Sequence, residues 1–284
     1  MIMRKIVVMF VALAATFSLA FAEPEAKYTT VNRHFNHQDF NRLAVGHSFQ
    51  VDLTFADTYS IDLEVPDFIE PYLRVKNVAG KLTISLEKLP VDIQHKLNRS
   101  DAKLYAKVSM PSLIGLELSG SSRLSASGLL QLDTKNLDID LSGASKLDEL
   151  HAKGVDRLTI DASGASSCHL DVESVEMRAD VSGSSHLKWD GVALRANIDG
   201  SGASHCRLEG NVAKMDIEAS GASKVVSNGE TEVASVEVSG ASSCRISVSE
   251  KLTYELSGAS TLRVKDQGAS IRGECSRGSK VVFD

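Results

Sequence analysis

Apolar and polar residues alternate along most of the chain from about residue 113 onward. Leu137, Ile139 and Leu141 occupy every second position, and Val236 and Val238 show the same spacing. A period of two is typical of β-strands that bury one face. No helical periodicity interrupts this pattern, so we predict that this part of the chain is all-β.

A short motif, Ser-Gly-Ser-Ser or Ser-Gly-Ala-Ser, separates the alternating segments and recurs along the chain. Its glycine position is filled by Gly120, Gly143, Gly164, Gly183, Gly202, Gly221, Gly240, Gly258 and, in a degenerate last copy, Arg277. Successive copies lie 23, 21, 19, 19, 19, 19, 18 and 19 residues apart. A strand-rich unit of this length predicts a single-stranded, right-handed parallel β-helix of about nine coils. We expect the coils to stack at ~4.8 Å, the spacing of hydrogen-bonded strands.

The positions around each motif predict which side chains face inward. The columns two residues before and four residues after the glycine are mostly apolar, and we place both in the core. We also expect the glycine and the Ser two residues after it to face inward, where the coil is too tight for larger side chains. Stacked Ser hydroxyls would then bond to one another along the coils.

Three of the four cysteines fall in one inward column. Cys168, Cys206 and Cys244 lie on every second coil, so neighbouring members are ~9.6 Å apart. A disulfide needs Cα atoms within ~7 Å. We therefore predict free thiols that act as small apolar core residues.

The first residues have the order of a secretory signal. Arg4 and Lys5 precede an apolar run that ends at Leu19, and the sequence Ala-Phe-Ala follows. The run is too short to predict a membrane span. We predict that residues 1–22 are removed, and that the mature chain from Glu23 has no membrane span and is periplasmic, extracellular or on the cell surface.

Residues 23–112 carry no Ser-Gly repeat but still show strand patterns. We predict strands at 49–55, 60–65, 81–86 and 103–110, a helical turn at 66–71 and an exposed polar loop at 89–101. A repeat stack needs a cap on its apolar end. We therefore assign 23–112 to an N-terminal β cap with the first irregular coils, continuous with a repeat β-helix over 113–284.

One outward column, three residues before the glycine, is acidic in all nine copies. It contains Glu117, Asp140, Asp161, Asp180, Asp199, Glu218, Glu237, Glu255 and Glu274. In register these carboxylates form a row ~4.8 Å apart, and like charges on adjacent strands repel.

The acidic row has two interpretations. In the first, solvent, salt and basic residues three positions after the glycine offset the repulsion of a solvated ladder. In the second, Ca²⁺ bridges candidate ligands along the row, namely Asp140, Asp161, Asp180, Asp199, Glu218, Glu237 and Glu255. We favour the ladder, because Ca²⁺ takes about six to eight oxygens and one flat column supplies few per ion. We predict no other cofactor.

Other chemistry is sparse. His186 and His205 share an outward column on neighbouring coils, with His169 nearby, and could share Zn²⁺ only if further ligands completed the set. The net charge of −6 argues against a nucleic-acid partner. No Gly-x-Ser-x-Gly sequence occurs, only 5% of residues are aromatic, and the coils are nearly uniform in length. We predict a non-catalytic protein that binds a glycan or protein of the cell envelope or of a surface; the alternatives are a polysaccharide-acting β-helix enzyme and a purely structural envelope element.

Several motifs together resemble a known family. They are Phe-Asn-Arg-Leu at 40–43, Val-Ser-Met-Pro-Ser-Leu at 108–113, and the train of Ser-Gly copies that begins at Ser119. This pattern resembles the head GIN domain family, described as putative auto-transporter adhesins and common in exported proteins of Bacteroidetes, over roughly residues 28–284. The resemblance implies an exported, non-enzymatic β-helical protein and supplies no binding residues. The chain shows no pattern of a translocating membrane β-barrel.

Overall fold

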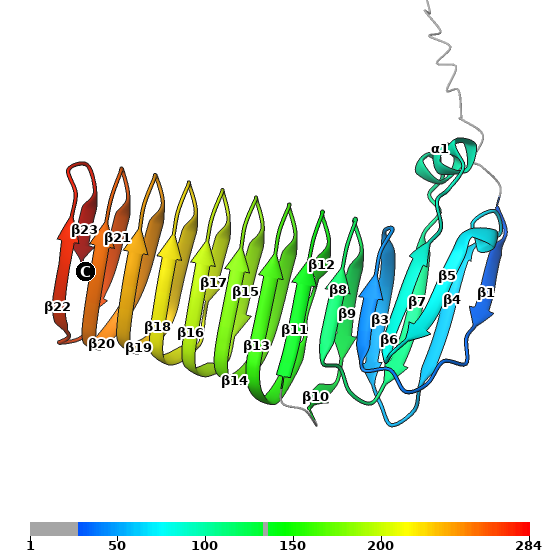
Figure 1. Ribbon diagram of the computed structural model, residues 1–284, viewed down its shortest axis with the longest axis horizontal. Helices are drawn as coiled ribbons and strands as arrows, with labels where there is room; N and C mark the ends of the chain where they lie inside the picture. The colour runs from blue at the N-terminus through cyan, green and yellow to red at the C-terminus, as the bar shows by residue number, and fades with distance from the viewer. Residues whose placement is uncertain (1–27, 133–135) are drawn as a thin grey trace, which may run out of the picture.

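The computed structural model describes residues 28–132 and 136–284, and the predicted signal peptide lies outside these ranges. The described strands form one continuous, flattened solenoid (Figure 1). In each coil of the repeat region, one strand leads into the Ser-Gly motif and a second strand leads away from it. We call the outward surfaces of these two sets of strands the leading face and the following face.

The elements of the N-terminal part are β1 (Thr30–His34), β2 (Arg42–Val45), β3 (Phe49–Phe55), β4 (Ser60–Pro66), η1 (Glu70–Tyr72), β5 (Leu73–Val78), β6 (Lys81–Leu86), α1 (Val91–Arg99) and β7 (Leu104–Met110). The first coils contain β8 (Gly115–Leu118), β9 (Arg123–Ser127), β10 (Leu129–Gln131), β11 (Asn136–Leu141), β12 (Lys146–Leu147), β13 (His151–Ala162), β14 (Ser167–Val181) and β15 (His186–Asp190). The remaining strands are β16 (Val192–Gly200), β17 (His205–Leu208), β18 (Asn211–Ala219), β19 (Lys224–Val238), β20 (Ser243–Leu256), β21 (Thr261–Asp266), β22 (Ser270–Cys275) and β23 (Lys280–Phe283).

Parallel pairing joins each coil of the repeat region to the next. On the leading face, β11 pairs with β13, β13 with β14, and β14 with β16. On the following face, β14 pairs with β15 and β15 with β17. The motif glycines stack in the same register, since the amide after each glycine donates to the carbonyl of the glycine one coil earlier. The predicted parallel solenoid of about nine Ser-Gly coils is therefore confirmed.

The Ser-Gly turns require glycine for a reason different from the one we predicted. From Gly120 to Gly258 these residues have φ between +68° and +75°, a region that disfavours side chains. They are exposed rather than inward-facing. A Cβ on Gly183 would nevertheless lie 2.4 Å from the carbonyl oxygen of Gly164, because consecutive turns stack backbone on backbone. The prediction of an inward glycine was wrong, since the turn breaks the alternation.

The Ser two residues after each glycine is buried, as predicted. The eight members from Ser122 to Ser260 are at most 2% exposed. Ser166 donates to the hydroxyl oxygen of Ser185 over 3.2 Å, so part of the column bonds from coil to coil. Other members bond within their own turn: Ser145 Oγ donates to the backbone carbonyl of Ser142 over 2.9 Å. These bonds satisfy hydroxyls in an otherwise apolar interior, although Ser204 Oγ and Ser260 Oγ have no hydrogen-bond partner within the described ranges.

Both predicted apolar columns line the core. The column before the turn includes Leu141 and Val181, and the column after it includes Leu147 and Leu187, all at most 2% exposed. Trp189 is a fully buried side chain of the core, and its indole N–H donates to the carbonyl of Val172 over 3.1 Å. One contiguous apolar cluster connects the N-terminal part to the repeat coils.

All four cysteines are free thiols, as predicted, and three of them are buried. Burial raises the pKa of Cys168, and it raises the pKa of Cys206 and Cys244 to about 12. Thiolates are the reactive form. We expect an alkylating reagent to modify only exposed Cys275 in the folded protein, and all four cysteines in denaturant without reductant. Mass spectrometry measures both states, and two or fewer modified thiols in denaturant would contradict the coil register.

The N-terminal part caps the solenoid with strands that are not stacked in chain order (Figure 1). Strand β2 pairs in parallel with both β6 and β8, and β3 pairs in parallel with both β7 and β9. Residues 42–55 thus form a coil between two segments that follow them in sequence. Antiparallel β5 covers the edge of β6, while β4 and then β1 extend beyond β7. Parallel stacking therefore ends in antiparallel edge strands.

The strands predicted at 49–55, 60–65, 81–86 and 103–110 are confirmed as β3, β4, β6 and β7, and η1 overlaps the end of the helical turn predicted at 66–71. The predicted loop at 89–101 was wrong, because α1 occupies most of it. Pro90 precedes the helix, Asp92 lies in its first turn, and Lys96 and Arg99 lie in its last turn. Ile93 and Leu97, one helical turn apart, pack partly against the core. Neither described helix is long and apolar enough to span a bilayer.

Candidate functional site: the acidic row

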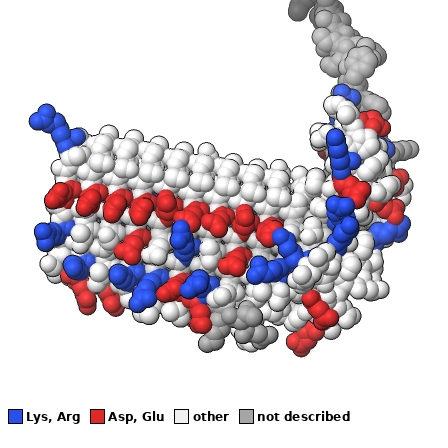
Figure 2. Space-filling model, in the orientation of Figure 1, with Lys and Arg blue, Asp and Glu red and all other residues white. Residues whose placement is uncertain are grey.

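The nine predicted carboxylates lie side by side on the leading face. Strand register pairs Glu117 with Asp140, Asp140 with Asp161, and so on without interruption to Glu255 and Glu274. Figure 2 shows them as a red band below the pale ridge of the Ser-Gly turns. Eight are exposed and Asp180 is half-buried. The sequence therefore located every member of this acidic row.

Two shallow grooves flank the acidic row. The groove on the turn side has a volume of about 440 Å³ and is lined by Glu218, Glu237 and Glu255 together with serines of the turns. The groove on the other side has a volume of about 470 Å³ and contains Arg178 and Asn197. The carboxylates thus form a ridge that an elongated partner can contact from both sides.

The basic residues that we expected to offset the acidic row do not do so. Lys146, three residues after a motif glycine, lies on the following face and pairs with Asp148. The turn separates positions before and after the glycine onto opposite faces. Within the described ranges, members of the row form two salt bridges: Glu117 with Lys81 over 2.5 Å and Asp180 with Arg178 over 3.1 Å.

The missing compensation affects the ionisation of Asp161. Burial raises the pKa of this carboxyl, and the charges of Asp180 and Asp140 raise it further. A carboxyl whose pKa is raised by folding disfavours the folded state when ionised. This contribution is lost as the pH falls through the raised pKa. At Asp161, the ionised carboxylate therefore opposes folding of the isolated protein at neutral pH.

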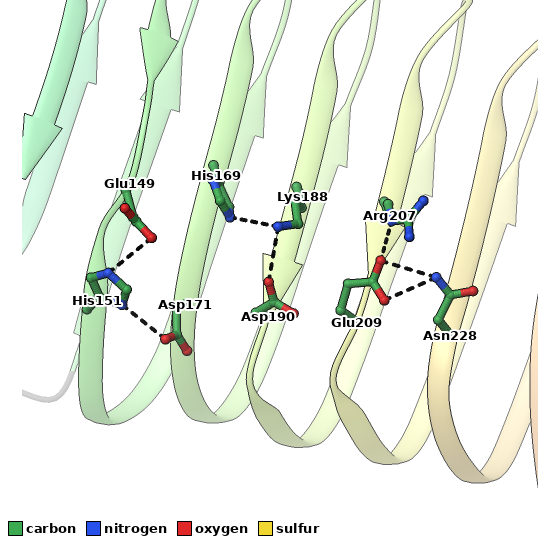
Figure 3. A network of polar contacts seen from close by, with 9 residues as sticks. All are labelled: Glu149, His151, His169, Asp171, Lys188, Asp190, Arg207, Glu209 and Asn228. Carbon is green, nitrogen blue, oxygen red and sulfur yellow. Dashed lines mark hydrogen bonds and ion pairs between the residues drawn. The ribbon is translucent and has the colours of Figure 1, made fainter.

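The following face carries a different arrangement, in which ion pairs connect neighbouring positions (Figure 3). His151 contacts Glu149 over 3.2 Å and Asp171 over 3.0 Å. Lys188 bridges His169, at 3.1 Å, and Asp190, at 3.4 Å. Glu209 pairs with Arg207 and accepts hydrogen bonds from Asn228. Acids on this face are thus paired with bases, unlike most of the acidic row.

The candidate metal ligands, the carboxylates of the acidic row and the imidazoles of His186 and His205, lie in rows along the solenoid and do not converge on one point. The rings of His186 and His205 lie side by side, with centroids 5.9 Å apart. Across the part of the chain that the structure describes, no group of three or more His, Cys, Asp or Glu side chains has an arrangement that could hold a metal ion. The geometry gives each carboxylate one neighbour above and one below, which suits a ladder better than an oxygen cage.

We expect calcium to have no specific effect on the acidic row. Asp199→Asn combined with Glu218→Gln neutralises two adjacent members that have no salt bridge within the described ranges. Relief of repulsion should leave stability unchanged or raise it by ~0.2–1 kcal/mol per relieved pair. Thermal unfolding of both proteins with calcium, magnesium or matched salt measures this. A calcium-specific rise in Tm that disappears in the double variant would show that the row is a calcium site.

Comparison with known proteins agrees with these observations. A family model described as "Putative auto-transporter adhesin, head GIN domain" matches residues 39–205 and again residues 152–268. The two matches overlap within the repeat coils and together cover most of the chain. A comparison with curated protein sequences found no match.

Solved structures from Parabacteroides share the fold. A putative adhesin from Parabacteroides distasonis aligns with a TM-score of 0.62 at 16% identity, covering 92% of this chain and 99% of that one. A putative lipid binding protein from the same species aligns with a TM-score of 0.64 at 14% identity, covering 90% and 96%. A putative adhesin from Parabacteroides merdae aligns with a TM-score of 0.53 at 15% identity, with the same coverage. By its sequence, its repeat coils and its N-terminal cap, the chain belongs to the head GIN domain family of putative auto-transporter adhesins.

Proposed function

We propose that this protein is an exported, non-catalytic interaction module of the cell envelope and that the acidic row is its main contact surface. The observation that carries the proposal is the unbroken row of nine carboxylates, most of them without a salt bridge within the described ranges. The fold does not need this row, because repulsion along it opposes stacking. A partner that supplies positive charge would convert this cost into binding energy.

The shape of the leading face also supports a binding role. The flanking grooves run along the solenoid and are open, so they suit an extended segment better than an enclosed small substrate. Partners of this kind are a protein segment rich in Lys and Arg, or a glycan with amino groups. The family's description as adhesins agrees with such a role, as does the signal sequence predicted at residues 1–22.

A glycan array and an envelope pull-down with the mature chain test the proposal. We expect specific capture of a ligand on the array or of an envelope component, and recovery of that ligand chemically unchanged after prolonged incubation. Chromatography and mass spectrometry of the ligand detect turnover. Cleavage or modification of a captured polysaccharide would favour the alternative, a polysaccharide-acting β-helix enzyme.

A further inference from the structure

The following face carries a strip of positive charge that the proposed function does not use. It comprises the outward positions three and five residues after each motif glycine. Its basic members are Arg123, Lys146, Lys188, Arg207, Lys224, Arg245, Arg263 and Lys280, joined by His169, His186 and His205. Asp148 is the only acid at these positions. We call this set the basic strip; it lies across the solenoid from the acidic row.

Strand register makes the basic strip continuous. His186 pairs with His205 and His205 with Lys224, while Lys188 pairs with Arg207 one column away. Side chains of these two columns line a groove of about 320 Å³ that also contains His169 and Lys146. Positive groups from successive coils are therefore presented along one line at the ~4.8 Å coil spacing.

The charges of the basic strip are only partly compensated within the chain. Five of its eight Lys and Arg side chains have an acidic partner, namely Arg123 and Lys146 with Asp148, Lys188 with Asp190, Arg207 with Glu209 and Arg263 with Asp284. Lys224 and Arg245 form no salt bridge within the described ranges. Partly paired cations beside unpaired ones leave a positive line that an extended anion can neutralise.

The histidines of the strip face cations or each other. His169 accepts a contact from Lys188 Nζ at Nε2 over 3.1 Å, which requires a neutral ring nitrogen, and Asp148 lies in the same groove. The neighbours of His186 are Ser167 and His205. His205 has His186 and Lys224 on either side, with Arg207 on its own strand, and burial with these charges lowers its pKa. An anion beside His205 would oppose this effect and favour its protonated form.

We propose that the basic strip binds an acidic polysaccharide whose carboxylate or sulfate groups lie along the solenoid axis, and that binding strengthens as His205 protonates. A linear polyanion fits a line of cations that repeats from coil to coil, and successive monosaccharides are close to one coil spacing in length. Single-stranded nucleic acid is the less suitable polyanion, because no Phe, Tyr or Trp occupies the strip to stack a base. The inference deepens the proposed interaction function but uses the opposite face.

The sign of the pH dependence follows from linkage. An anion beside His205 stabilises the charged form of its imidazole, so binding takes up protons. Affinity should therefore rise as the pH falls from about 7.5 to about 5.5.

Fluorescence anisotropy of the mature chain with labelled polygalacturonate, dextran sulfate and neutral dextran tests the proposal at both pH values and constant ionic strength. At least one acidic polymer should bind, with affinity about tenfold higher at the lower pH, and neutral dextran should not bind. Lys188→Gln with Arg207→Gln should weaken binding at least about tenfold at both pH values. His186→Gln with His205→Gln should retain binding at the higher pH and lose most of the increase at the lower pH.

Lys214→Gln with Lys251→Gln is the matched control, since it removes two exposed cations outside the strip. The proposal is overturned if neither acidic polymer binds, if this control loses as much affinity as the strip variant, or if single-stranded DNA of similar charge binds as tightly. Neutralising the acidic row tests the proposed function separately, because that change should not weaken binding to the strip.

Discussion

Replacing Gly183 with Ala should lower the free energy of unfolding by about 2–4 kcal/mol. The left-handed backbone at φ +70° disfavours a side chain by about 1–2 kcal/mol. The added Cβ would also lie 2.4 Å from the carbonyl oxygen of Gly164, and backbone cannot move aside as a flexible side chain can. Displacing one turn should weaken its bonds to both neighbouring coils. Denaturant unfolding measures the loss.

Gly154→Ala is the control for the stacking of the turns. Gly154 has φ +71°, almost the same conformation as Gly183, but a Cβ there would meet no atom within 4 Å. Only the conformational penalty of about 1–2 kcal/mol should therefore apply. Equal losses for the two variants would contradict close backbone stacking of the Ser-Gly turns.

Trp189→Ala should cost about 3–5 kcal/mol, the range for removing a buried aromatic side chain. Trp189 is fully buried, and its removal would leave a cavity between coils and the carbonyl of Val172 without its indole donor. Trp189→Phe keeps most of the apolar contact and should cost about 1–3 kcal/mol, mainly for the lost hydrogen bond. Chemical denaturation of both variants separates the cost of the lost apolar contact from that of the lost hydrogen bond. An alanine variant as stable as wild type would contradict a packed interior around Trp189.

The coils and the acidic row could be predicted because a repeat converts sequence spacing into spatial register. Once Gly143 and Gly164 are equivalent, Asp140 and Asp161 must be neighbours, and alternation places both outside. The same rule located the column of Cys168 and Cys206. These predictions needed only the period of a strand and a repeated turn.

The wrong predictions concern parts of the chain where repeat spacing and alternation do not determine which residues are neighbours. The inward position of Gly183 and the pairing of Lys146 with the acidic row both extended alternation through a turn, which reverses the chain and changes the face. The β2–β3 coil lies between strands that follow it in sequence, and no local pattern records such pairing. Helix α1 spans only nine residues and buries none of them completely, so only Ile93 and Leu97 mark its inner face in the sequence.

Two features were missed although the sequence carried a signal for each. A second glycine column, Gly191, Gly210 and Gly229, lies at the opposite bend, where added Cβ atoms would also meet backbone. Its spacing of 19 residues is visible in the sequence. The basic strip is also visible in the sequence, because the positions three and five residues after each motif glycine lie on the same face and are rich in Lys, Arg and His.

The most direct test of the central claim is partner binding by a variant with a neutralised acidic row. Asp199→Asn, Glu218→Gln and Glu237→Gln remove three central charges of the row, and Glu230→Gln, Glu232→Gln and Glu250→Gln remove three exposed charges outside the row in the same part of the solenoid. Affinity for the ligand captured on the array or from envelopes is measured for both variants and for wild type. We predict a loss of at least about tenfold for the row variant and a change within about twofold for the control. Equal affinities for all three proteins would contradict the assignment of the acidic row as the contact surface.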